Sequence, residues 1–135
     1  MIVDTSALVA ILFDEPEAVA LATILDSAES LCMSAATYLE LSIVIDKRKK
    51  PALSNRIDEI LDRYEIYIEY VTSEQAKIAR QAYRDFGTGS GSRANLNFGD
   101  CFSYALARVK HKPLLFKGDD FIHTDIRPAA NLDAL

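Results

Sequence analysis

The chain has 135 residues, of which 50% are hydrophobic and 26% are charged, and its formal net charge is −5 at pH 7. This length suits one compact domain, so we expect residues 1–135 to form a single domain. No apolar run approaches the roughly 18–20 residues that span a membrane. No basic segment precedes Ile2, as it would in a signal peptide. We therefore expect a cytoplasmic protein with no membrane partner.

The first half of the chain predicts two strands and two or three helices. Residues 1–3 resemble a short buried strand that ends in Asp4, and residues 6–13 suit one or two helical turns. Pro16 suits the start of a helix that reaches about residue 27. After a strand at residues 30–33, Ser34 is a plausible N-cap for a helix that runs to the basic residues 47–50 and stops at Pro51.

The middle of the chain continues this alternation. A helix is predicted at about residues 54–64, and the β-branched and aromatic residues 66–71 predict a strand. Thr72 is expected to cap the next helix, which reaches about residue 86, and Gln75 completes a capping box.

The last third begins with a Gly/Ser-rich loop at residues 87–95. Asn97 is then expected to cap a helix that runs to about residue 110. Residues 113–116 predict a strand, and Ile126 is expected to add a final short one. The whole pattern indicates an α/β domain with a short, mostly parallel central sheet flanked by helices.

Four acidic positions lie in apolar or small-residue surroundings, and two of them follow predicted strands. Asp4 and the pair Asp119 and Asp120 fall just past a strand's carboxyl end, where sites form in parallel sheets. Glu40 and Asp100 are predicted on helices, on the faces that pack against the sheet.

Each acid alone has a structural explanation. Asp4 suits a turn, Asp100 suits the positive end of a helix dipole, and Asp120 suits a solvated loop. Several buried carboxylates in one small domain need compensation, which is usually a divalent cation. The set therefore favours a metal-dependent active site.

Oxygen ligands suit Mg²⁺, with Mn²⁺ as an alternative, and such ions promote phosphodiester cleavage. Thr5 and Ser6 follow Asp4 directly. Their hydroxyls are expected to orient a carboxylate, a water or a scissile phosphate, or simply to cap the next helix.

Four segments together resemble a known family. These are Ile2-Val3-Asp4-Thr5-Ser6-Ala7-Leu8, a mid-helix Glu40, Asn97-Phe98-Gly99-Asp100-Cys101-Phe102, and Leu114-Leu115-Phe116-Lys117-Gly118-Asp119-Asp120-Phe121. In this order, over essentially the whole chain, they look like a PIN-domain ribonuclease of the VapC type, the toxins of bacterial toxin–antitoxin pairs.

The resemblance implies a PIN-like fold over residues 1–135 and a magnesium-dependent endoribonuclease, usually a homodimer. It also implies a cognate antitoxin whose C-terminal segment covers the acidic site. Asp4, Glu40 and Asp100 match the family's acidic residues. Many members place the fourth acid three residues before the Phe, where this chain has Gly118.

The role of the fourth acid is therefore carried to Asp120 or Asp119, with Asp120 preferred, and Asp125 is an outside candidate. Arg93 or residues 47–50 are expected to attract the RNA backbone. The alternative for residues 47–50 is a solvated helix end favoured by the helix dipole.

Other functions fit less well. A phosphatase of the haloacid-dehalogenase type needs a second acid where this chain has Ser6. A response-regulator receiver needs an acceptor Asp at the end of a central strand, and residues 66–71 supply none. The Gly-rich residues 87–91 follow a helix, so a nucleotide-binding loop lacks its context. A catalytically inactive PIN-like module that binds RNA or protein remains as the serious alternative, although such a protein is expected to lose acids.

Overall fold

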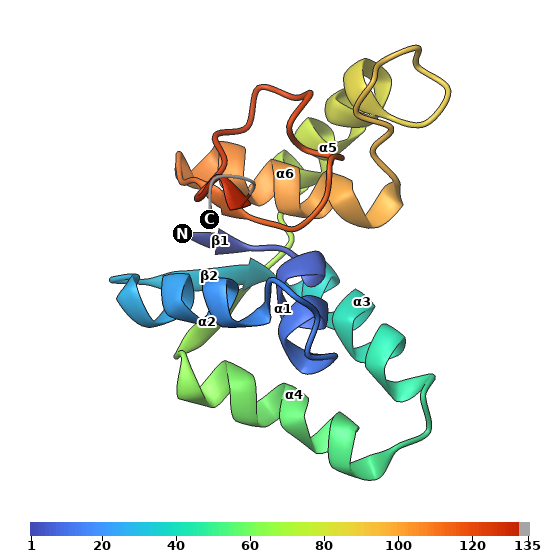
Figure 1. The fold of residues 1–135 in the computed structure, drawn as a ribbon. Coiled ribbons are helices and arrows are strands. Elements are labelled where there is room, and N and C mark those ends of the chain that lie inside the picture. The colour runs from blue at the N-terminus through green and yellow to red at the C-terminus, as the bar shows by residue number, and fades with distance from the viewer. Residues whose placement is uncertain (133–135) are drawn as a thin grey trace.

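The computed structural model describes residues 1–132 as a four-stranded sheet with helices on both faces (Figure 1). The strands are β1 (Ile2–Val3), β2 (Leu31–Ser34), β3 (Ile66–Glu69) and β4 (Leu114–Leu115). The helices are α1 (Thr5–Leu12), α2 (Ala18–Ser27), α3 (Ala35–Asp46), α4 (Pro51–Arg63), α5 (Ser73–Phe86) and α6 (Phe98–Lys110). The predicted α/β class is confirmed.

Side-chain caps explain where three of the helices begin. The Ser34 hydroxyl accepts a hydrogen bond from the Ala36 N–H at 3.2 Å, and the Thr72 hydroxyl accepts one from the Gln75 N–H at 3.1 Å. Asn97 forms a complete capping box with Asp100. For the predicted Thr72 box, the structure records the Thr72 half. Local polar residues thus set these starts, as capping chemistry requires.

Some predicted boundaries differ from the structure. Pro51 is the first residue of α4, where its fixed φ and missing N–H are tolerated, so this helix starts before residue 54 and α3 ends at Asp46. The strand predicted at 66–71 ends at Glu69. The prediction of a final strand at Ile126 is wrong. Instead, Pro128 forms an isolated bridge to Leu114, because the Ala129 N–H reaches the Leu114 carbonyl at 2.8 Å.

The sheet is parallel throughout and has the order β3-β2-β1-β4. The chain moves outward from β1 to β2 and β3, and then crosses to β4 on the other side of β1. A crevice forms at such a switch point, beyond the carboxyl ends of the two strands. Asp4 extends the ladder by one bond, from its N–H to the Leu115 carbonyl at 2.9 Å, and so lies at this crevice.

Alternating side chains of the paired strands β1 and β4 enter two separate cores. Val3 and Leu115 belong to the cluster covered by α1 to α4, and Ile2 and Leu114 belong to the cluster covered by α5 and α6. This alternation follows from the two-residue period of a strand. The layers lie on opposite sides of β1 in Figure 1. Although β1 and β4 have only two residues each, they contribute to both cores because both of their faces are buried.

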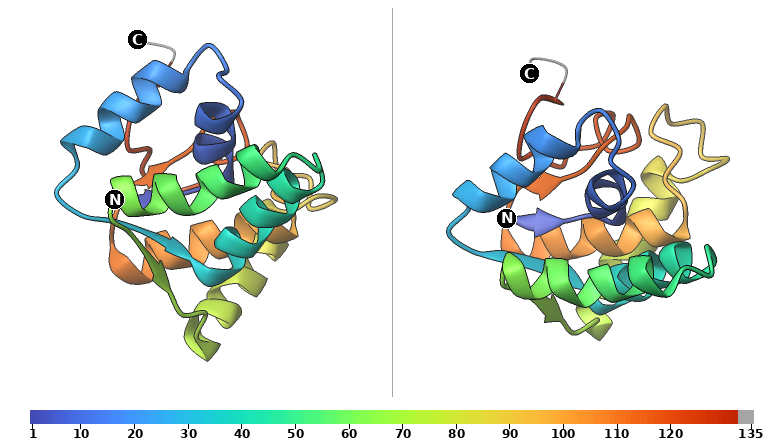
Figure 2. Two further views of the ribbon diagram at one scale, coloured as in Figure 1. Left: turned by 90° about the horizontal axis from the view of Figure 1, so that it is seen from below. Right: turned by 60° about the horizontal axis from the view of Figure 1, so that its bottom comes forward.

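Two connections extend at the end of the domain toward which the strands point. The loop after α5, which carries Arg93, and the turn between α3 and α4 both lie at this end (Figures 1 and 2). Within residues 1–132, none of the helices is both long and apolar enough to cross a membrane.

We predict that Leu114→Ala and Leu115→Ala each lower the free energy of unfolding by about 2–5 kcal/mol, because each removes a buried side chain from a different core. Urea unfolding measures both effects. Leu39→Ala, at a residue that is 58% exposed on α3, is the control and should change stability by less than about 0.5 kcal/mol. A small effect at either strand position would contradict the two-core description.

Candidate active site

Asp4 is the centre of the site and is only 3% exposed. It caps α1, and its Oδ2 accepts hydrogen bonds from the Ser6 N–H at 3.0 Å and the Ser6 hydroxyl at 2.7 Å. Its Oδ1 accepts a bond of 2.6 Å from the Ser103 hydroxyl on α6. Both carboxylate oxygens are therefore oriented by donors on two different helices.

The two hydroxyls that follow Asp4 both donate to carboxylates. Thr5 is buried, and its Oγ1 lies 2.6 Å from Oε1 of the half-buried Glu40. Ser6 donates to Asp4, and its Oγ accepts the Lys117 N–H at 3.0 Å. Ser6 thereby joins the end of β1 to the end of β4. Of the roles expected from the sequence, the structure gives these hydroxyls the orientation of carboxylates, while Asp4 itself supplies the helix cap.

Asp100 is held by the first turn of its own helix. Its Oδ2 accepts the Asn97 N–H at 2.9 Å, and Asn97 Oδ1 accepts the Asp100 N–H at 2.9 Å. The residue is 8% exposed. The capping box therefore fixes the orientation of this carboxylate as well as the start of α6.

Sequence reasoning did not assign a role to three residues that join α3 to α6. The Ser103 hydroxyl lies 3.2 Å from the Thr37 hydroxyl, which links the partner of Asp4 to the helix of Glu40. A Cβ atom at Gly99 would overlap the Glu40 carboxylate, so the absence of a side chain there lets α6 begin against α3. The sequence signal that could have identified them is a small residue close to the acid on the buried face of each helix: Thr37 near Glu40, and Gly99 and Ser103 near Asp100.

Of the three candidates for the fourth acid, Asp120 lies nearest in electrostatic terms to the other acids. The charge of Asp120 contributes to the raised pKa of Asp100. The charge of Asp4 in turn contributes to the raised pKa of Asp120. Asp119 is an exposed neighbour that borders a separate pocket with Glu17 and Lys117. Asp125 is paired instead with Tyr104 and Arg108 on α6.

Burial and mutual repulsion raise the pKa of three of these carboxyls. Burial is the largest cause for Asp100, and the charges of Asp4, Asp120 and Glu40 add to it, so that its pKa rises to about 7. Burial also raises the pKa of Glu40, against the bond from Thr5. Burial and then the Asp4 charge raise the pKa of Asp120. Each carboxylate therefore makes the charged form of its neighbours less favourable.

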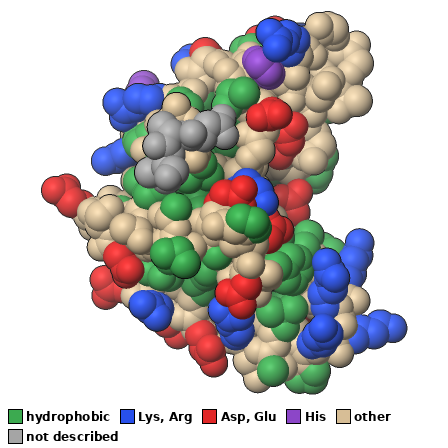
Figure 3. Space-filling view, in the orientation of Figure 1, with side chains coloured by type: hydrophobic (Ala, Val, Ile, Leu, Met, Phe, Trp, Pro, Cys, Tyr) green, Lys and Arg blue, Asp and Glu red, His purple; other side chains and the backbone are tan. Residues whose placement is uncertain are grey.

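Among residues 1–132, the ion pairs of Lys and Arg side chains involve acids other than Asp4, Glu40, Asp100 and Asp120. Lys117 is the cation that follows β4, and its Nζ contacts Glu15 Oε2 and lies 3.0 Å from Glu17 Oε2. The remaining ion pairs join Arg108 to Asp125 and Lys110 to Glu69. Acidic side chains are prominent in the middle of the face shown in Figure 3, and Lys and Arg gather over the end of α3 and α4.

The donor set suits a divalent cation in kind, since it offers carboxylate oxygens and an excess of negative charge. In the described part of the chain, however, no three or more His, Cys, Asp and Glu side chains are arranged so that they could hold a metal ion. Glu40 is turned toward Thr5, and Asp100 toward the Asn97 N–H.

Comparison with known proteins agrees with the fold. A family model described as PIN domain matches residues 1–127. The chain is 53% identical over 129 residues to VapC ribonuclease Mb2780c of Mycobacterium bovis, a match that covers 96% of this chain and 98% of the relative. Ribonuclease VapC28 of Mycobacterium tuberculosis is also 53% identical over 129 residues, with 96% and 97% covered.

Two solved structures share the fold at lower identity. One is the crystal structure of Mycobacterium tuberculosis VapC20, described as a sarcin-ricin loop cleaving toxin, with a TM-score of 0.70, 19% identity and coverage of 94% and 98%. The other is a toxin–antitoxin complex from Klebsiella pneumoniae, with a TM-score of 0.69, 16% identity and 92% of each chain covered. This chain belongs to the PIN-domain family and, within it, to the VapC ribonucleases.

We predict that Asp100→Asn stabilises the metal-free protein, and more so at pH 8 than at pH 5. An unfolded Asp has a pKa of about 4, whereas that of folded Asp100 is about 7. Folding therefore takes up a proton in this window, and the stability present below the unfolded pKa is lost as the pH rises through the folded one. Asparagine keeps the acceptor for the Asn97 N–H but carries no charge.

Thermal unfolding in the presence of a chelator tests this, with the exposed Asp26→Asn as the control. A gain in Tm that is the same at both pH values would contradict the raised pKa of Asp100.

Proposed function

We propose that this protein is a magnesium-dependent endoribonuclease that cleaves RNA phosphodiester bonds and acts as the toxin of a toxin–antitoxin pair. The observation that supports the proposal is that Asp4, Glu40 and Asp120 lie near enough to Asp100 for their charges to help raise its pKa, close to the switch point of the sheet. Three of these carboxyls have a raised pKa, and among the described residues no Lys or Arg forms an ion pair with any of the four. A cation from solution would provide the missing positive charge.

In this proposal Asp4, Glu40, Asp100 and Asp120 hold Mg²⁺ or Mn²⁺, with Asp119 beside them. The metal supplies activation of a water molecule and stabilisation of the charge that develops on the phosphate. Ser6 and Ser103 hold both oxygens of Asp4, and Thr5 orients Glu40. Outer-shell donors of this kind keep ligands in place and typically change metal affinity or activity 10–100-fold.

RNA is expected to approach from the end of the domain that carries the acids. Arg93 is exposed in the loop after α5, and residues 47–50 form an exposed basic turn between α3 and α4 at the same end (Figure 2). Arg48 is anchored by stacking over the Phe13 ring, with its Cζ 4.6 Å from the ring centroid. These cations offset the net charge of −5 locally, and their contribution to RNA binding should weaken with salt.

The partners follow from the relatives. The names of the relatives describe VapC ribonucleases, and one structural neighbour is a toxin–antitoxin complex. We therefore propose a cognate antitoxin whose C-terminal segment covers the acidic site, a homodimeric assembly and a cytoplasmic location. The alternative is an inactive PIN-like module that binds RNA or protein, which the presence of candidates for all four acids disfavours.

We predict that Asp4→Asn and Asp100→Asn each reduce RNA cleavage at least about 100-fold, since each removes a proposed metal ligand rather than an outer-shell partner. Purified protein free of antitoxin is incubated with total RNA and Mg²⁺, Mn²⁺ or chelator, at low and high salt. Asp26→Asn is the control for a lost carboxylate, and circular dichroism checks that each variant is folded.

Metal-dependent fragments from the wild type, absent from both variants, are the expected result. Full cleavage by both variants would refute the assignment of the site. No fragments under any metal, from folded wild-type protein, would favour the binding module or a very narrow RNA target.

A further inference from the structure

The segment between β4 and Pro128 follows one face of α6. Asp100, Tyr104 and Arg108 are spaced four residues apart, so they form a stripe along this helix. Asp120 is coupled electrostatically to Asp100 at one end of the stripe, and Asp125 contacts Tyr104 and Arg108 further along it. Two of the three acids in this segment, Asp120 and Asp125, thus interact with the two ends of this stripe.

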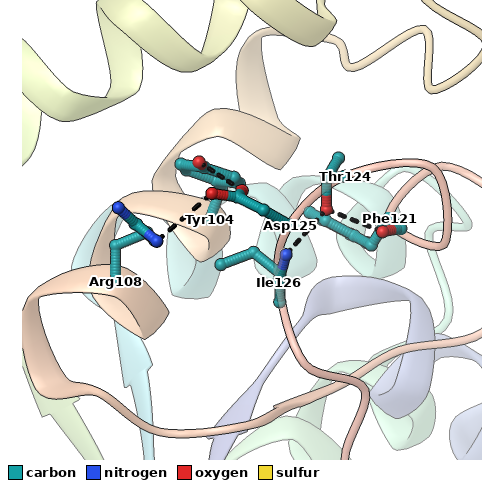
Figure 4. Close-up of polar contacts among 6 residues, drawn as sticks. All are labelled: Tyr104, Arg108, Phe121, Thr124, Asp125 and Ile126. Carbon is teal, nitrogen blue, oxygen red and sulfur yellow. Dashed lines mark hydrogen bonds and ion pairs between the residues drawn. The ribbon is translucent and has the colours of Figure 1, made fainter.

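Asp125 is held by two donors from α6 (Figure 4). The Tyr104 hydroxyl donates to Oδ1 at 2.6 Å, and Arg108 Nη1 lies 3.2 Å from Oδ2. Tyr104 is buried and packs against the Phe86 ring at a centroid distance of 5.9 Å, so its hydroxyl is presented from a fixed position. The Arg108 contact is half-exposed on both sides, and an ion pair of that kind contributes little. The tyrosine bond is therefore the main restraint.

The six residues from Asp120 to Asp125 also form hydrogen bonds among themselves. Phe121 is 2% exposed and packs on Phe116 at a centroid distance of 5.1 Å. The Phe121 carbonyl accepts bonds from the Thr124 hydroxyl at 2.7 Å and the Thr124 N–H at 3.1 Å, and the Thr124 hydroxyl accepts the Ile126 N–H at 3.2 Å. This turn therefore connects the backbone beside Asp125 to Phe121, the neighbour of Asp120.

We propose that Asp125, held by Tyr104, is a positioning residue that keeps the exposed Asp120 beside Asp100 in readiness for a divalent cation. This inference rests on the proposed metal-dependent function. Asp125 then contributes through geometry and not as a ligand, which explains why an acid so close to the site in sequence is paired with α6.

The test compares Mn²⁺ binding by the wild type and by Tyr104→Phe, measured by titration calorimetry on the whole protein. The substitution removes one hydroxyl and keeps the ring. A hydrogen bond to a charged group corresponds to about a tenfold effect or more when it is lost, so the dissociation constant is expected to rise roughly tenfold. Asp125→Asn should also raise the dissociation constant for Mn²⁺. Because Asp125 is exposed, this variant replaces Tyr104→Phe in the test if Tyr104→Phe is poorly folded.

Two controls separate positioning from general stability. Tyr70→Phe removes a phenol hydroxyl from a residue that is 77% exposed and should leave the Mn²⁺ affinity unchanged. Leu61→Ala removes a buried side chain of α4 from the other core, away from Tyr104, and should lower Tm without the tenfold loss of affinity. Hydrogen exchange should be faster at residues 119–125 in metal-free Tyr104→Phe than in the wild type.

A double-mutant cycle identifies Asp120 as the residue through which Asp125 acts. In an Asp120→Asn background, Tyr104→Phe should weaken Mn²⁺ binding no further, whereas independent effects would add. In RNA cleavage, Tyr104→Phe should raise the Mg²⁺ concentration for half-maximal activity and keep the maximal rate at saturating metal.

Equal Mn²⁺ affinity in the wild type, Tyr104→Phe and Asp125→Asn would overturn the inference. Additive losses of affinity in the double-mutant cycle would overturn it as well. Those results would leave the ribonuclease function standing if the wild type cleaves RNA. Conversely, a wild type that binds Mn²⁺ but cleaves no RNA would contradict the proposed function, while the calorimetric comparison would still decide the role of Asp125.

Discussion

The hydrogen bonds that Asp4 accepts from Ser6 and Ser103 connect all the parts of the candidate site. Ser6 is bonded to the backbone just past β4, and Ser103 lies against Thr37 of α3. Through these contacts, one carboxylate joins the ends of β1 and β4 to helices from both layers. The arrangement holds negative groups together despite their repulsion, because neutral hydroxyls satisfy Asp4 without any compensating charge.

The shortness of β1 makes this convergence possible. The strand has two residues and is followed at once by α1, so α3 and α6 meet just beyond its end. Gly99 leaves room for the Glu40 carboxylate at this contact. A domain built in this way brings carboxylates together at one edge, and the energetic cost appears as the raised pKa of Asp100, Glu40 and Asp120. Folding and the proposed function thus compete at the same residues.

Local features of the site could be predicted from the sequence, and tertiary ones could not. The cap at Asn97 and the position of Asp4 after a strand depend on neighbouring residues, and capping and periodicity rules reach them. The roles of Ser103 and Gly99 depend on α3, which lies about sixty residues earlier in the chain. The role of Asp125 depends on a tyrosine 21 residues before it. The wrong prediction of a strand at Ile126 also reflects a tertiary contact. The residue that pairs with Leu114 of β4 is Pro128, two positions further along the chain.

We propose that Asp4, Glu40, Asp100 and Asp120 share a divalent cation. The most direct test is to soak Mn²⁺ into crystals of the wild-type protein and to locate the ion by its anomalous scattering. The account predicts a peak at the crevice beyond β1 and β4, with carboxylate oxygens of Asp4 and Asp100 at roughly 2.0–2.3 Å, a distance typical of small hard cations. It also predicts that the peak disappears in Asp4→Asn crystals. Saturating Mn²⁺ that leaves this crevice empty, or that binds only at other acids, would contradict it.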